Sequence, residues 1–87
     1  MATLSFKVPS DEGQNKRLRT EFTKRLGERL REIRKAKGLT QQQLAEKAIL
    51  HLTYVGHLEL GKYHPTVFVM WKISKALGVS MNELTNL

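Results

Sequence analysis

Three histidines are the side chains of this 87-residue sequence best suited to chemistry: His51, His57 and His64. Two metal ligands on one face of a helix need an i, i+4 spacing, whereas these histidines lie six and seven residues apart. The sequence has no cysteine, and it has no glycine-rich phosphate loop, paired carboxylates or nucleophile beside a base. It therefore predicts neither catalysis nor a metal or cofactor site.

An excess of positive charge is the second chemical feature. Lysine and arginine number 15 against 8 aspartate and glutamate residues, which gives a formal net charge of +7 and a pI of 10.1. Such a charge attracts polyanions, either nucleic acid or an anionic membrane surface. A soluble basic protein without any polyanionic ligand has the same composition, so charge alone leaves the partner open.

Residues 39–59 have the pattern of two short helices joined by a tight turn. Thr40 and Gln43 are spaced as a capping box, in which each side chain bonds the other residue's backbone N–H, so a helix is expected to begin there. The small Ala45 lets a second helix approach closely, and that helix is expected to begin near His51. Two helices that cross steeply after a short turn form a helix-turn-helix, which places its second helix in the major groove of DNA.

Three further helices are expected around this pair. The longest, over residues 16–37, is amphipathic and ends at Gly38, a typical left-handed C-cap. Its apolar stripe consists of Phe22, Leu26, Leu30 and Ile33. Another helix follows Thr66, with the inward stripe Val67, Met70, Ile73 and Leu77. A short last helix begins at a second capping box, formed by Ser80 and Glu83. The sequence thus predicts one all-α domain of five helices, because a chain this short supports a single core.

Phe68, Val69 and Trp71 fall on flanking or outward positions of the helix over residues 66–77. This is a large apolar surface for a short helix. Either another part of the chain covers it, or it is a site of self-association. We expect these three residues to form a dimer interface.

The first 19 residues are expected to form an arm outside the helix-turn-helix domain of residues 20–87. Leu4, Phe6 and Val8 alternate with polar neighbours, as in a short strand. A single strand has no partner in a helical chain, so the arm is either flexible or pairs with a second copy. The basic residues of the arm that are expected to contact DNA phosphates are Lys16, Arg17 and Arg19.

Residues 26–84 resemble the Xre family of prokaryotic helix-turn-helix regulators, the type found in phage Cro and repressor DNA-binding domains. The resemblance rests on the Leu-Thr-Gln entry to the motif, the Leu-Ala pair, the Glu-x-Gly after its second helix and the later Ala-Leu-Gly-Val-Ser run. It implies a lambda-repressor-like domain and a DNA-binding transcriptional regulator. Residues 1–20 lie outside it.

The resemblance also assigns roles to individual positions. Gln41 matches a position that typically contacts a DNA phosphate, and Lys62 matches a second backbone contact in the loop after the motif. Arg34 and Glu59 match a structural ion pair. The positions that typically face base edges are occupied by Leu52, Thr53 and His57.

The sequence departs from the family pattern within the motif itself. Ile49 stands where glycine normally makes the turn, so its backbone must avoid the left-handed region or accept strain. His51 replaces the usual Ser or Thr and is a weaker cap. The reading face has no Arg, Gln or Asn for bidentate base contacts, and Gly56 loosens the helix while letting it sit close to a partner. These departures predict modest direct readout and an affinity that falls steeply with salt.

Together the features predict a dimeric, cytoplasmic and nucleoid-associated repressor or controller that binds double-stranded DNA at a palindromic operator, without a cofactor. No segment has the length and apolarity of a membrane span. Two alternatives stay open. One is an antitoxin-like protein that binds DNA and also a partner protein. The other is a protein-interaction or membrane-surface module that has kept the fold but does not read DNA.

Overall fold

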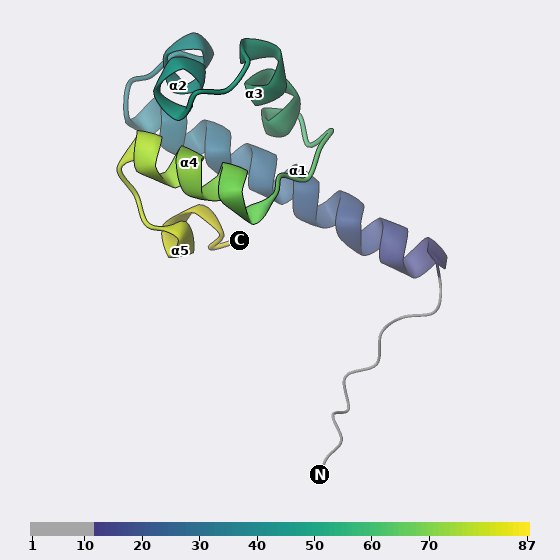
Figure 1. Cartoon of the computed structure of the whole chain (residues 1–87). Coiled ribbons are helices and arrows are strands. Elements are labelled where there is room, and N and C mark those ends of the chain that lie inside the picture. Colours follow the sequence, from purple (N-terminus) through teal and green to yellow (C-terminus); the bar gives the residue numbers. More distant parts are fainter. Residues whose placement is uncertain (1–11) are drawn as a thin grey trace.

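A computed structural model describes residues 12–87, and these residues form five helices and no strand. In chain order the helices are α1 (Glu12–Ala36), α2 (Gln41–Ala48), α3 (Leu52–Glu59), α4 (Val67–Leu77) and α5 (Met81–Leu84). α1 is the long axis of the molecule, and both α3 and α5 pack against it, while α4 packs against α2 and α5 (Figure 1). The predicted all-α architecture of five helices is confirmed.

The hydrophobic core forms where the apolar faces of the five helices meet. Its buried members are Leu26, Leu30, Ile33, Leu44, Ala45, Ala48, Val55, Leu58, Met70, Ile73, Leu77 and Leu84. Two predicted stripe residues are not among them, since Phe22 is 41% exposed and Val67 is 72% exposed. Phe22 precedes Thr23, the first buried residue of α1, and Val67 is the first residue of α4. Val67 thus lies at a helix end, whereas Phe22 lies within α1, before the part of that helix that packs on the core.

The predicted starts of α2 and α5 and the predicted end of α1 agree with the structure. The Thr40 hydroxyl accepts from the Gln43 backbone N–H at 3.0 Å, and the Gln43 side chain accepts from the Thr40 N–H at 2.9 Å, which completes the capping box of α2. Ser80 and Glu83 form the second box, at the start of α5. Gly38 ends α1 in the left-handed conformation with φ 73°. These local signals orient the chain at each turn before any core contact is made.

α1 begins earlier than predicted. It starts at Glu12 and not near residue 16, so residues 12–15, which were expected to precede the helix, are helical in the structure. Lys16, Arg17 and Arg19 are therefore exposed residues of a helix that projects past the rest of the domain (Figure 1). An acidic residue in the first turn suits the positive end of the helix dipole. The expected strand over residues 4–8 lies outside the described residues.

Gly27 marks the closest approach between α1 and α3. A Cβ atom built at this position would lie 2.6 Å from the backbone oxygen of Glu59 and would also collide with that of Leu58. Glycine in mid-helix costs about 1 kcal/mol relative to alanine, but here the missing side chain allows the two helix backbones to touch.

None of the described helices is long and apolar enough to cross a membrane.

Candidate nucleic-acid interface

α2 and α3 form the predicted helix-turn-helix, with a turn at residues 49–51. α3 buries Val55 and Leu58, which are 0% and 2% exposed, and α2 buries Ala45, which is 3% exposed. The opposite face of α3 is left outside the core. Thr53 is exposed there and His57 is half-buried, while Leu52 at the start of the helix is 46% exposed.

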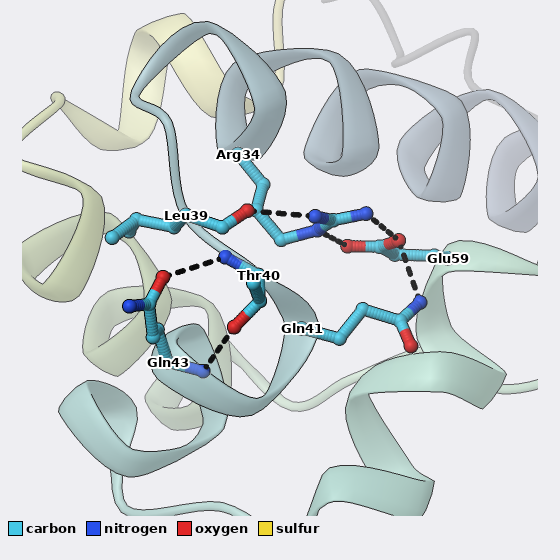
Figure 2. A network of polar contacts seen from close by, with 6 residues as sticks. All are labelled: Arg34, Leu39, Thr40, Gln41, Gln43 and Glu59. Carbon is cyan, nitrogen blue, oxygen red and sulfur yellow. Dashed lines mark hydrogen bonds and ion pairs between the residues drawn. The ribbon is translucent and has the colours of Figure 1, made fainter.

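A buried polar network fixes the orientation of α3 (Figure 2). Arg34 on α1 donates two hydrogen bonds to the carboxylate of Glu59 on α3, with Nε–Oε2 at 2.6 Å and Nη2–Oε1 at 3.0 Å. Its Nη1 donates to the Leu39 carbonyl at 2.8 Å. The two charged side chains are only 9% and 3% exposed. The structure thus brings together the two residues expected to pair, and their ion pair ties α1, α3 and the entry to α2 into one unit.

Gln41, the first residue of α2, belongs to the same network. Its Nε2 donates to Glu59 Oε1 at 2.9 Å, so one N–H of the amide is already used within the protein (Figure 2). A glutamine amide has a second N–H, and the first backbone N–H groups of a helix have no partner within the helix. Both kinds of donor suit an anion at this end of α2.

An aromatic cluster that sequence reasoning missed lies beside the outer face of α3. The ring of Tyr63, in the loop after α3, stacks on Tyr54 with centroids 5.8 Å apart and meets the edge of His57 at 5.2 Å. Burial, and then the neighbouring Tyr63, raise the pKa of Tyr54. The i, i+3 spacing of Tyr54 and His57 hinted that they share a helix face. Only the folded loop shows that Tyr63 joins them.

The loop after α3 is anchored at its start. Gly61 is left-handed with φ 76°, and an added Cβ would come within 3.0 Å of the Lys24 Cα on α1. The Lys62 backbone N–H donates to the His57 carbonyl at 2.9 Å, which closes the end of α3. The exposed Lys62 side chain therefore leaves from a defined position close to the outer face of α3.

The sequence left two possibilities for Ile49, a backbone that avoids the left-handed region or a strained one within it, and the structure has the strained one. Ile49 ends α2 with φ 55° and ψ 57°, in the left-handed region, and it is the one non-glycine residue with positive φ among those described. The Leu50 N–H donates to the Ala45 carbonyl at 2.8 Å, and the ammonium group of Lys72 donates to the Ile49 carbonyl at 3.0 Å. The Ile49 side chain is 80% exposed. His51 starts α3 without a side-chain hydrogen bond.

An exposed aromatic pair lies on α4. Phe68 and Trp71 are 64% and 47% exposed and stack with centroids 6.2 Å apart. The ammonium group of Lys72 lies 5.3 Å from the Phe68 ring centroid, and that of Lys75 lies 5.5 Å from the Trp71 centroid. Val69 differs from its two predicted companions because it is half-buried against the core.

Several positive charges of α1 are neutralised locally. Arg25 pairs with Glu21 and Arg29 with Glu32, each at 3.0 Å. These pairs are exposed or partly exposed, so they contribute little to stability. Within residues 12–87, no group of three or more His, Cys, Asp or Glu side chains is placed to hold a metal ion.

The chain belongs to the helix-turn-helix family HTH_3, whose model matches residues 30–84. Over 59 residues it is 37% identical to the immunity repressor protein of Bacillus phage phi105, a match that covers 68% of this chain and 41% of the repressor. It is 39% identical to the control protein C.BamHI of Bacillus amyloliquefaciens over 59 residues, which are 67% of this chain and 73% of that protein.

A solved structure is similar over most of its length. The restriction-modification controller protein C.AhdI from Aeromonas hydrophila superposes with a TM-score of 0.70 at 39% identity, covering 74% of this chain and 96% of that one. The resemblance to Xre-type regulators is thereby confirmed. The protein is a DNA-binding helix-turn-helix regulator of transcription and belongs to a class of proteins that are not enzymes.

Proposed function

We propose that the protein acts on the chromosome as a dimeric repressor or controller, with α3 of each copy in the major groove of a palindromic operator. The observation that carries the proposal is the outer face of α3. It is left free by the core and held in place by the buried pair of Arg34 and Glu59, so the reading side chains start from a rigid backbone. Preorganised contacts of this kind favour specific binding. Leu52, Thr53 and His57 are the residues proposed to face base edges.

Phosphate contacts are proposed on both sides of that face. Gln41 offers an amide N–H and the N-terminus of α2, and Lys62 offers an ammonium group from the anchored loop. The projecting start of α1 adds three exposed basic residues, Lys16, Arg17 and Arg19, that would follow the backbone of the duplex beyond the half-site. Because the outer face of α3 has no Arg, Gln or Asn, much of the affinity is expected to come from phosphates.

The exposed aromatic pair of α4 supports the dimer. Two copies joined through Phe68 and Trp71, with Val69 at the edge, would remove apolar surface from water on both partners. To bind both halves of one operator, this dimer must hold its two α3 helices about 34 Å apart, one turn of B-DNA. An operator with two-fold symmetry follows from a two-fold symmetric protein.

Selection of bound sequences from a random DNA pool, at low and at moderate salt, tests the proposal. An enriched inverted repeat is expected, and Thr53→Ala and His57→Ala should each relax the preference at one position of the half-site. Lys62→Ala should weaken binding to the selected and to random DNA alike. Arg25→Ala is the matched control, because it removes the same charge from a residue that pairs with Glu21.

The proposal has clear opposing results. If no sequence is enriched although the protein binds the pool, the protein does not recognise an operator. If Thr53→Ala, His57→Ala and Lys62→Ala all weaken binding to the selected and to the random DNA to the same extent, α3 does not read the base sequence. Enrichment of a single half-site with no repeat would exclude the two-fold dimer on DNA.

One observation favours a second candidate function, binding of a partner protein as in antitoxin-like regulators. Lys72 and Lys75 border the aromatic pair, and α4 itself has no acidic residue. An acidic, apolar segment of another protein would satisfy both features, whereas two copies of this face would bring four lysines together. Sedimentation of the purified protein distinguishes the two: a monomer at micromolar concentration favours the partner, and a dimer favours self-association.

A further inference from the structure

Gly56 is a glycine that nothing within the chain explains. It lies in the middle of α3, where glycine makes a helix less stable than alanine does. From Gly27 onward, every other glycine has a structural reason. Gly27 touches the backbone of α3, and Gly38, Gly61 and Gly78 have positive φ.

Gly56 is half-buried, yet the space beside it would admit a Cβ atom. A Cβ atom added there would have the Gln41 Oε1 as its nearest neighbour, at 3.8 Å, which is ordinary van der Waals contact. The folded chain would therefore accept alanine without any movement, and the helix would become more stable. A reason for the missing side chain must be sought outside the chain.

Gly56 sits on the proposed reading face. In a helix it neighbours Leu52 and Thr53, which lie four and three residues earlier on the same side. Val55, Leu58 and Glu59 take the buried side. Because Gly56 has no side chain, the outer face of α3 is lower at this position than at the residues around it. A partner can therefore come closer to the helix backbone there than at any neighbouring position.

We propose that Gly56 is a specificity-determining residue at which the edge of a base pair contacts the backbone of α3, and that this edge carries a thymine methyl group. The proposal rests on the proposed function and identifies the chemistry of one contact within it. The Gly56 α-carbon has no side chain that could form a hydrogen bond, and the adjacent Leu52 side chain is apolar and 46% exposed. In the major groove the thymine methyl is the apolar feature among otherwise polar base edges.

The first test is Gly56→Ala, measured in the full chain. Its thermal midpoint should rise, because alanine is the better helix former and meets no clash. Its affinity for the selected operator should fall by about tenfold or more, as for the loss of one base contact, while binding to random duplex changes little. Gly56→Ser, with a similar added volume, should weaken operator binding in the same way.

The second test replaces thymine by uracil, one position at a time, in the selected operator. Loss of one methyl in each half-site should weaken binding of the wild-type protein, and the same replacement should matter less to Gly56→Ala, which has already lost the close contact. Unchanged operator affinity of Gly56→Ala, together with its raised midpoint, would refute the inference while leaving the proposed function intact. If uracil has no effect at any position, the methyl assignment is wrong. If the wild-type protein selects no operator, the proposed function fails first and this inference fails with it.

Discussion

Replacing Ile49 by glycine should stabilise the protein. Ile49 holds φ 55° and ψ 57°, a region that costs an L-amino acid about 1–2 kcal/mol and glycine almost nothing. The substitution removes little packing, because the side chain is 80% exposed. Both hydrogen bonds of the turn are kept, since they use the Leu50 N–H and the Ile49 carbonyl.

The expected gain is smaller than the relieved strain. Glycine gives the unfolded chain extra freedom, which opposes folding by about 0.4–1 kcal/mol. The remaining gain is centred on about 0.8 kcal/mol, within limits of about 0–1.6 kcal/mol, and its central value raises the thermal midpoint of a domain of this size by about 3–6 °C. Urea titration should show a higher midpoint with an unchanged slope, because the surface exposed on unfolding stays the same.

Two control variants separate the backbone from the side chain. Ile49→Ala removes nearly the same apolar group but keeps the left-handed cost, so it should gain clearly less than Ile49→Gly. Gly38→Ala should destabilise, because Gly38 has φ 73° and an added Cβ there touches nothing within 4 Å, which leaves only the backbone cost. If Ile49→Gly is no more stable than Ile49→Ala, the left-handed conformation is not a source of strain in this protein.

Three further predictions concern packing, the buried ion pair and the dimer. Gly27→Ala should destabilise by about 1–3 kcal/mol, because its methyl overlaps the α3 backbone; a midpoint equal to wild type in a thermal melt would show that α1 and α3 can separate freely. Arg34→Ala should cost about 3–5 kcal/mol, since it leaves the buried Glu59 carboxylate without its partner, and a loss below 1 kcal/mol in urea titration would contradict that reasoning. Phe68→Glu combined with Trp71→Glu should yield a monomer in sedimentation at unchanged helix content, and an unchanged dimer would mean that the interface lies elsewhere.

Much of the fold was predictable because its signals are local. Capping boxes such as Thr40 with Gln43 operate within one helical turn, so the sequence places the helix starts without knowledge of the core. The start of α1 was predicted less well, because local signals are weaker there. Among residues 12–19 the one large apolar side chain is Leu18, so helical periodicity did not show how far α1 extends toward the N-terminus.

Part of the candidate DNA-binding site could likewise be predicted from the sequence, and part of it could not. The residues of α3 that were expected to face base edges came from the resemblance to the family, because each of its positions has a marked place in the motif. The contribution of Tyr63 could not be predicted, because its contacts with Tyr54 and His57 depend on how the loop after α3 folds back. The exposure of Val69 was also overestimated, since a position at the flank of a helix is buried or exposed according to its neighbours.

Spacing along the chain and residue types at marked positions were enough to predict the class of fold, the helix-turn-helix and the family. Other features depend on contacts between distant parts of the chain. The tertiary structure shows that Gly27 is required by the contact of two backbones, that Ile49 accepts the left-handed conformation, and that Gly56 has room for a side chain it does not carry. For the two glycines the outcome depends on whether another part of the chain occupies the space beside the residue. For Ile49 it depends on the hydrogen bonds of the turn, which form only in the folded chain.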